Sequence, residues 1–440
     1  MSTTMSRIQH SYSSFQTTPT ALDKPRHVKY FLRCLKTFLP TPYTSNDSNR
    51  MSLAFFVVSG LDLLDALVPN TSDLERADYI NWVYRNQHPH GGFRAFPGTD
   101  LGEHTTPENE CWDPANLPST YFALASLLVL GDDLSRVRRK ETLAWLPTLQ
   151  RKDGSFGETL VNGAIEGGTD PRFGYCATGV RYMLRGDAEG EIEGCTDIDV
   201  DKLVQCIRSA ETYDGGLSDK PYHEAHAGFT FCAIGALDFC DRLPAQYSRR
   251  RREARPKDPG LTNPQWTIHW LLSRQTATIT DEDEFDTHAD ETDTPATCHD
   301  AHSFVHPEAF PSKQGRMNYK ERPTSRFDLE WTGFNGRCNK IADTCYAFWV
   351  LGALSMLSQP QLPDRDSLRR YLLERTAHLA LGGFGKHAGD LPDVYHSYLG
   401  LAALSLTGDE QLKPLDGAMC ISKEAKARLG NIWKRWGVPT

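Results

Sequence analysis

Asp153-Gly154-Ser155-Phe156-Gly157 is one of five glycine-rich turns whose recurrence along the chain decides the fold. The other four are Gly91-Gly92-Phe93, Asp214-Gly215-Gly216-Leu217, Gly333-Phe334 and Gly382-Gly383-Phe384-Gly385. The steps from Gly92 through Gly154 and Gly215 are 62 and 61 residues, and the later steps, to Gly333 and Gly383, are 118 and 50. The turns therefore mark a repeat, and the long step contains one repeat plus an insertion.

Each turn is followed by an apolar segment that opens with small and aromatic residues, as in Ser119-Thr120-Tyr121-Phe122-Ala123 and Cys345-Tyr346-Ala347-Phe348-Trp349. Another helix precedes each turn, so each unit is a helix pair that must stack on its neighbours to bury its apolar faces. Strand-like alternation is almost absent. We therefore expect an all-α fold, an α/α toroid in which equivalent ends of the inner helices meet at one mouth.

Composition excludes several classes of protein. The 440 residues are 39% hydrophobic and 24% charged, with a net charge of -9, which argues against wholesale disorder and against a basic nucleic-acid-binding surface. Apolar runs are shorter than the roughly 20 residues of a membrane span, and no signal-peptide pattern opens the chain. The chain has eleven cysteines, an odd number without the paired spacing of a disulfide framework, which favours a reducing compartment. We expect a cytoplasmic protein that is not an integral membrane protein and does not bind nucleic acid.

The domain organisation follows from the repeat. Residues 1–25 are Ser/Thr-rich and are predicted to form a flexible tail, and residues 26–440 a single barrel domain. An acidic insertion at about 276–328 interrupts it and is predicted to be disordered, because Asp281–Asp293 carries eight acidic residues. The Arg249–Arg252 run fits a surface helix end better than a nuclear-localisation signal.

Asp343, Cys345 and His396 form a candidate metal site. Asp343 and Cys345 open one inner helix, and His396 opens the next, 51 residues after Cys345. Stacked repeats would bring a carboxylate, a thiolate and an imidazole together and leave one coordination position free, as in catalytic zinc sites. The alternative is a helix cap, a core cysteine and an unrelated histidine.

Cationic groups recur at the same end of the repeats. They are Arg172, His226, Arg337, Lys340 and Lys386. Tyr175, Phe229, Tyr346, Trp349 and Tyr395 would line the mouth beneath them. A cationic rim above aromatic walls suits an amphiphile with an anionic head and a hydrocarbon tail.

These residues resemble the β subunits of protein prenyltransferases, from about Arg26 to Leu406. The motifs that carry the resemblance are Glu224–Gly228, Gly333–Lys340 and Asp343–Trp349. The resemblance implies a barrel of six inner and six outer helices, one catalytic zinc ion, an isoprenoid diphosphate and an α-subunit partner.

Carried over onto this sequence, the resemblance gives Asp343, Cys345 and His396 as zinc ligands. It gives His226, Arg337, Lys340 and Tyr346 as diphosphate-binding groups, and Tyr346 and Trp349 as lipid walls. Arg172 matches a residue near the carboxylate end of the substrate peptide. Their motif neighbours are assigned to the same substrate-binding surface: Ala227, Gly228, Cys338, Asn339, Ala347 and Phe348.

The chain resembles the type I geranylgeranyltransferases most. Ser52 stands where farnesyltransferases carry a bulky Trp, so the funnel would accept a 20-carbon rather than a 15-carbon chain. Lys386 stands where related enzymes have a magnesium-binding Asp, which implies zinc without obligatory magnesium. Two residues depart from the family pattern. Ala227 stands where the family commonly has Gly, and Cys338 resembles the residue in the farnesyltransferase version of its loop rather than in the type I version.

We therefore expect transfer of a geranylgeranyl group to the Cys of proteins that end in C-a-a-X, such as Rho/Rac-type small GTPases, with X often Leu. Asp343, Cys345, His396, Tyr346 and Lys386 would be catalytic. The alternatives are a farnesyltransferase β subunit and a non-catalytic toroid binding module. A terpene cyclase is disfavoured, since the chain has no Asp-x-Asp-Asp motif.

Overall fold

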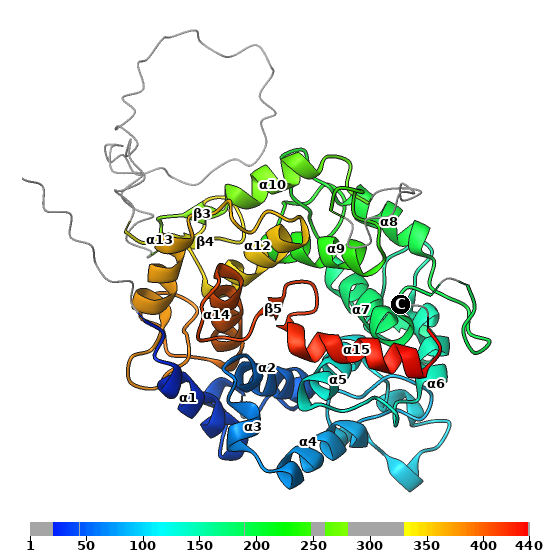
Figure 1. The fold of residues 1–440 in the computed structure, drawn as a ribbon. Helices are drawn as coiled ribbons and strands as arrows, with labels where there is room; N and C mark the ends of the chain where they lie inside the picture. The colour runs from blue at the N-terminus through cyan, green and yellow to red at the C-terminus, as the bar shows by residue number, and fades with distance from the viewer. Residues whose placement is uncertain (1–20, 44, 189, 248–259, 280–329, 439–440) are drawn as a thin grey trace, which may run out of the picture.

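The computed structural model describes residues 21–43, 45–188, 190–247, 260–279 and 330–438. Two concentric layers of helices form a ring (Figure 1). Within the described residues, six helices make the inner layer: α2 (Arg50–Leu63), α5 (Leu117–Leu130), α7 (Pro171–Arg185), α9 (Ala227–Phe239), α12 (Thr344–Met356) and α14 (Val394–Thr407). Each contacts the next, and α14 contacts α2, so the ring is closed.

The outer layer alternates with the inner one along the chain. Its helices in the described residues are α1 (Lys24–Lys36), α4 (Asp73–Arg85), α6 (Arg139–Trp145), α8 (Val200–Ser209), α10 (Pro264–Leu272) and α13 (Arg365–Arg370). A short helix, α3 (Leu67–Asn70), joins α2 to α4, and a π-helical segment, Tyr371–Thr376, continues α13. The predicted all-α toroid is confirmed.

The inner helices are apolar on nearly every side because neighbours cover them all round. In α5, for example, twelve of fourteen residues are buried. Outer helices such as α8 bury one stripe only, at Leu203, Val204 and Ile207. This difference is the expected one between a helix in a core and a helix at a surface.

The glycine turns fit the repeats together. Gly154 and Gly215 have φ of +90° and +100°, and a Cβ on either would collide with the backbone of the next outer helix, at Lys202 and Trp266. Gly382 meets Arg26 of α1 in the same way, which joins the last turn to the first helix. Only glycine combines this backbone conformation with so close an approach.

Strands are few and short in the described part of the chain. Three antiparallel pairs occur: β1 (Thr159–Val161) with β2 (Ala164–Glu166), β3 (Gln275–Thr276) with β4 (Gly333–Phe334), and β5 (Leu415–Asp416) with β6 (Ile421–Ser422). Their registers pair Leu160 with Ile165, Gln275 with Phe334, and Leu415 with Ser422. The second pair spans the insertion, so it fixes both ends of that segment to the ring.

The C-terminal region closes one end of the ring. Helix α15 (Lys423–Arg435) lies against the ends of α5 and α7, where Arg428 and Trp433 donate hydrogen bonds to the carbonyls of Leu128 and Met183. Because those carbonyls lie in the last turns of their helices, the opposite end of the ring holds the helix starts. No described helix is long and apolar enough to cross a membrane.

Two predicted boundaries need correction. Leu22 is buried and α1 begins at Lys24, so residues 21–25 belong to the fold rather than to a tail. Thr276 pairs with Gly333 and Ile279 is buried, so residues 276–279 also belong to it. The predictions for residues 1–20, for Arg249–Arg252 and for residues 280–328 of the insertion lie outside the described residues.

Candidate metal centre and cationic mouth

The candidate site lies at the end of the ring where the inner helices begin. The residue before each of four consecutive inner helices caps it by accepting a backbone N–H bond with its side chain: Asp170, His226, Asp343 and Asp393. Such caps stabilise helix starts. Because the helices are parallel members of one ring, their caps and first turns meet around one mouth.

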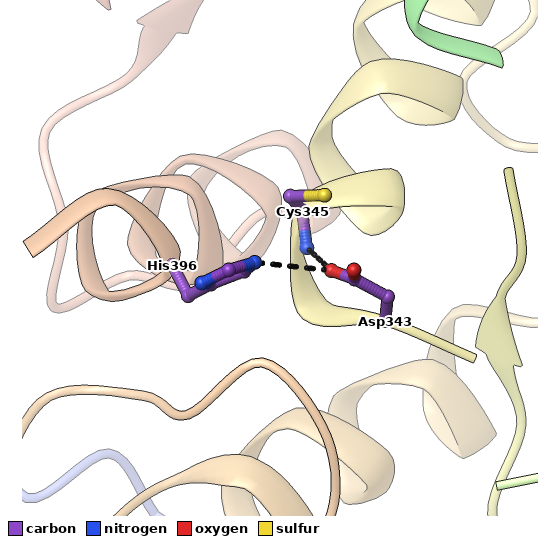
Figure 2. Close-up of side chains that lie close together, drawn as sticks. All are labelled: Asp343, Cys345 and His396. Atoms are coloured by element: carbon purple, nitrogen blue, oxygen red, sulfur yellow. Dashed lines mark hydrogen bonds and ion pairs between the residues drawn. The ribbon is translucent and has the colours of Figure 1, made fainter. Parts of the chain in front are cut away.

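The three predicted metal ligands are brought together there. Asp343 and Cys345 are buried, and His396 lies beside them from the next helix (Figure 2). Asp343 Oδ1 accepts the Cys345 N–H at 2.8 Å and lies 3.3 Å from His396 Nε2. One ligand atom of each residue lies within 4.8 Å of the others. Asp343 is thus a helix cap, as in the alternative to a metal site given above, and it is also a member of the cluster.

Burial and mutual contact shift the protonation of all three. Burial, together with the neighbouring Asp343 carboxylate, raises the pKa of the Cys345 thiol well above its usual range. Burial would also raise the pKa of Asp343, but its hydrogen bond to His396, the charge of that imidazole and its hydrogen bonds to Cys345 together outweigh burial and lower the pKa. Burial would lower the pKa of His396, yet hydrogen bonds to Asp343 and Asp393 raise it to about 9. Without a metal, the cluster is held by a protonated imidazole.

The cluster has the chemistry of a zinc site. It offers one oxygen, one sulfur and one nitrogen ligand, the set that Zn²⁺ takes in proteins. A buried thiol beside a carboxylate is a poor acid, and a divalent cation is the partner that would favour its thiolate. The residues present therefore fit zinc.

Asp393 orients His396, a role that the sequence analysis missed. Its Oδ2 accepts a hydrogen bond from His396 Nδ1 at 2.5 Å, and its Oδ1 accepts one from the Tyr43 hydroxyl at 3.2 Å. The imidazole thus presents Nε2 to the cluster, as metal-binding histidines with a carboxylate partner do. The signal in the sequence was an Asp three residues before the His, which also reads as an ordinary helix cap.

His226 and Tyr346 form the polar part of the next sector. His226 Nδ1 accepts the Gly228 N–H at 3.1 Å, and its Nε2 lies 3.1 Å from the Tyr346 hydroxyl. Burial lowers the pKa of His226, and the nearby Arg337 and Arg172 lower it further. Because Nδ1 of His226 accepts a hydrogen bond, the neutral imidazole carries its proton on Nε2. Nε2 is therefore a hydrogen-bond donor toward the mouth.

Arg172 and Arg337 flank this sector. The Arg172 guanidinium lies 5.7 Å from the Phe229 ring centre and makes a bidentate ion pair with Asp170, its Nε 2.7 Å from Oδ1. Arg337 lies 3.4 Å from Glu224. Both arginines remain exposed. The mouth is therefore cationic in part, since each arginine shares its charge with a carboxylate.

The loop after β4 carries the other predicted groups. Arg337, Cys338, Asn339 and Lys340 are all exposed. The loop is fixed to both neighbouring helices, because Ala227 donates to the Gly336 carbonyl at 2.9 Å and a Cβ at Gly336 would collide with Tyr346. Lys386 is exposed beside the start of α12, where its carbonyl accepts the Thr344 N–H at 2.9 Å.

Three predicted contact residues do not face the mouth. Ala227, Ala347 and Phe348 have no exposed surface. They support the binding surface from behind, while Gly228, Tyr346, Phe229, Trp349 and Tyr395 stay partly exposed. The methyl group of Ala227 is therefore not in the approach path of an anion. Tyr175 is also buried, and its hydroxyl donates to the Ala418 carbonyl instead of lining the mouth.

Ser52 lies in the first turn of α2, partly exposed, with its hydroxyl bonded to the Asn49 carbonyl at 2.9 Å. Helix α2 stands across the ring from α9, which begins beside His226 (Figure 1). Ser52 is therefore in the far wall of the mouth rather than at the closed end.

Comparison with known proteins agrees with this architecture. Residues 22–421 match the model of the prenyltransferase α/α toroid domain. Geranylgeranyl transferase type-1 subunit beta of Arabidopsis thaliana is 30% identical over 91% of this chain and 89% of its own, and the Dictyostelium discoideum subunit is 29% identical over 93% and 97%. A solved structure of Candida albicans protein geranylgeranyltransferase-I, complexed with GGPP, covers 94% of this chain and 99% of its own at 28% identity and a TM-score of 0.71.

Proposed function

Because the chain belongs to the prenyltransferase α/α toroid family, as a β subunit of the geranylgeranyl transferase type-1 kind, we propose that it transfers a geranylgeranyl group to the Cys of C-a-a-X proteins. The observation that carries this proposal is the Asp343–Cys345–His396 cluster beside a cationic, aromatic mouth. Rho/Rac-type small GTPases would be among the substrates, and a cytoplasmic location stays a prediction.

Asp343, Cys345 and His396 would hold one zinc ion. When bound, zinc lowers the pKa of a coordinated thiol and so makes a cysteine thiolate available at neutral pH. Asp393 keeps His396 in the tautomer that such binding needs, by accepting its Nδ1–H.

The rest of the mouth would bind the prenyl diphosphate. His226 Nε2–H, the Tyr346 hydroxyl, Arg337, Lys340 and Lys386 are donors on one side of the ring. Negative charge grows on the diphosphate as the C1–O bond lengthens, and fixed donors stabilise that charge most in the transition state. Lys386 would supply a positive charge there, so magnesium would not be required.

Partner binding is part of the proposal. Exposed apolar side chains lie in the turns at the open end: Tyr213 and Tyr222, which are 93% and 104% exposed, and Leu379 and Leu391, at 73% and 74%. Aromatic side chains such as these tyrosines are enriched at protein–protein interfaces. A prenyltransferase α subunit would cover these turns and leave the mouth open to the peptide.

The test is a donor competition. The chain is co-expressed with a prenyltransferase α subunit and given farnesyl and geranylgeranyl diphosphates together, with peptides ending in Leu or Ser, with and without magnesium. We expect transfer of the 20-carbon group to the Leu peptide without magnesium. Preferred transfer of the 15-carbon group to the Ser peptide would make the chain a farnesyltransferase subunit. No transfer by a zinc-loaded complex would contradict the proposal.

Ser52→Trp tests the chain-length argument. A bulky ring in the far wall should shift the ratio of kcat/KM for the two donors toward the 15-carbon donor by about tenfold or more. Val68→Trp adds the same ring on the exposed face of α3, where Val68 is 63% exposed, and should leave the ratio unchanged. An unchanged ratio in Ser52→Trp would refute Ser52 as the residue that measures length.

A further inference from the structure

Three consecutive backbone carbonyls occupy the centre of the ring beneath the mouth. They belong to Ala418, Met419 and Cys420, between β5 and β6, and this segment is called the plug below. Tyr175, Tyr121 and Tyr398 donate their hydroxyls to these carbonyls at 2.6, 2.8 and 2.5 Å. The tyrosines come from α7, α5 and α14, so three inner helices hold the plug.

The tyrosines stand at equivalent positions, each five residues after its helix cap. Phe231 of α9 and Phe348 of α12 occupy the same position, and Phe55 of α2 completes a girdle of aromatic rings. Five residues of helix span about 7 Å. The girdle, and the plug inside it, therefore begin only about one and a half turns below the caps.

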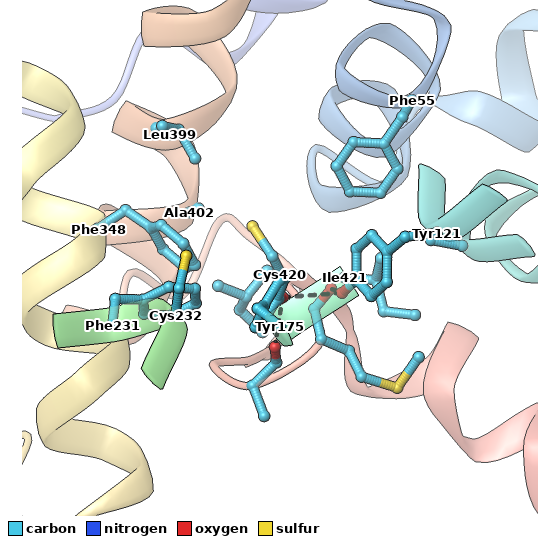
Figure 3. Close-up of a cluster of buried hydrophobic side chains, with 14 of the residues drawn as sticks. Phe55, Tyr121, Tyr175, Phe231, Cys232, Phe348, Leu399, Ala402, Cys420 and Ile421 are labelled. Carbon is cyan, nitrogen blue, oxygen red and sulfur yellow. Dashed lines mark hydrogen bonds between the residues drawn. The ribbon is translucent and has the colours of Figure 1, made fainter. Parts of the chain in front are cut away.

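The plug presents the Cys420 side chain to the middle of this girdle. Figure 3 shows Cys420 between Phe348 on one side and Tyr121 on the other. Cys420, Cys232 and Tyr175 each keep 7% of their surface exposed, whereas Ala233 and Ile234 of α9 keep none. Cys420 is thus buried in the girdle, with a small part of the residue still exposed.

The plug backbone has little freedom to move away. Cys420 has a φ of +53°, a conformation rare for residues other than glycine, and its N–H donates to the Asp416 carbonyl at 2.9 Å. A Cβ at Gly417 would collide with the Ser355 hydroxyl of α12. Lys426 pairs with Asp416 at 2.5 Å and ties the plug to α15. A larger side chain at position 420 would therefore extend into the space above.

From this geometry we propose that the plug is the inner wall of the lipid site and that Cys420 is a specificity-determining residue for the prenyl chain. Ser52 limits how far the prenyl chain extends across the ring, and Cys420 limits how deeply the prenyl chain enters the ring. The inference rests on the proposed function. It assigns to the C-terminal segment, which closes the other end of the ring, a direct part in choosing the donor.

The test measures donor binding, which does not depend on turnover. Dissociation constants of farnesyl and geranylgeranyl diphosphate are obtained by calorimetry for the complex with the α subunit. Cys420→Met should weaken binding of the 20-carbon donor about tenfold more than that of the 15-carbon donor. Cys420→Ala, which only removes atoms, should improve binding of a 25-carbon prenyl diphosphate relative to the 20-carbon one.

Cys34→Met is the matched control, since Cys34 is buried on the outer helix α1, and it should leave both affinity ratios unchanged. A merely structural plug would lower stability without changing either ratio. Unchanged ratios in both Cys420 variants, with normal binding by the parent complex, would overturn the inference and leave the proposed function intact. Failure of the parent complex to bind either donor would overturn both.

Discussion

The two ends of the ring use the same repeat for opposite purposes. At the open end, the caps and first turns of the inner helices carry acidic, imidazole and phenol groups that bond to one another and stay partly exposed, such as His226, Tyr346 and His396. Toward the closed end, at the plug, aromatic hydroxyls bond to backbone carbonyls and are buried. Position within the helix, more than residue type, decides whether a polar side chain is available for chemistry.

This comparison predicts that substitutions at the open end change zinc binding or transfer with little loss of stability, and that removing a hydroxyl bond to the plug lowers stability without changing zinc binding. The largest effect is expected for Cys345→Ala. Removing one of three ligands should abolish both stoichiometric zinc and transfer, as measured by metal analysis and a prenylation assay. Cys34→Ala, a buried thiol in α1, should keep both. Normal turnover without zinc would rule out the cluster as the metal site.

Asp393→Asn addresses the residue that orients His396. An amide can still cap α14 but cannot hold the imidazole as a carboxylate does, so zinc affinity should fall by about 10- to 100-fold. Competition with a chelator of known affinity measures this change. Asp364→Asn alters the cap of α13 in the same way, and its zinc affinity should not change. Equal losses in both variants would indicate a general effect of the caps.

The metal-free protein should lose stability as pH rises. The pKa of His396 is raised from 6.5 to about 9 in the folded state, so its stabilising contribution is complete below pH 6.5 and is lost as pH rises toward 9. The loss should be on the order of 2 kcal/mol, measured by urea unfolding. Zinc affinity should rise over the same window, because the metal competes with the imidazole proton. Unfolding independent of pH would contradict the raised pKa.

The smallest effect is expected at the closed end. Tyr398→Phe removes the hydroxyl that bonds to the Cys420 carbonyl and should lower the free energy of unfolding by about 1–2 kcal/mol. Tyr371→Phe is the matched control, since the Tyr371 hydroxyl is buried without a hydrogen-bond partner in the described structure, and it should cost nothing. Zinc binding should be unchanged in Tyr398→Phe, and a loss of zinc there would break the separation between the two ends.

Much of the fold and of the site could be predicted from the sequence. Glycine spacing predicts the helix pairs because only glycine tolerates the close approach at Gly154 and Gly215. The same spacing brings Asp343 and Cys345 to His396, since equivalent positions of neighbouring repeats are neighbours in a ring.

The closed end could not be predicted in this way. Tyr175 contacts Ala418 across 243 residues through a backbone carbonyl, an acceptor that every residue offers, so the sequence carries no sign of the pairing. Phe348 and Trp349 are adjacent aromatics that both pack against Phe231, yet Phe348 is buried and Trp349 stays partly exposed, a difference that only the assembled ring decides. Asp393 was overlooked because capping and ligand orientation have the same local pattern.

Closure of the ring has a consequence for how the chain is made. Asp62 of α2 bonds to Lys413 and Ser422, partners 351 and 360 residues further along the chain. During synthesis, the first helix pairs must wait for almost the whole polypeptide before their last neighbours leave the ribosome. Contacts of such long separation form slowly, and the incomplete ring meanwhile exposes the apolar sides of its terminal helices. We therefore expect the nascent chain to need chaperones, and chains that stop short of residue 422 to be degraded rather than to accumulate as partial rings.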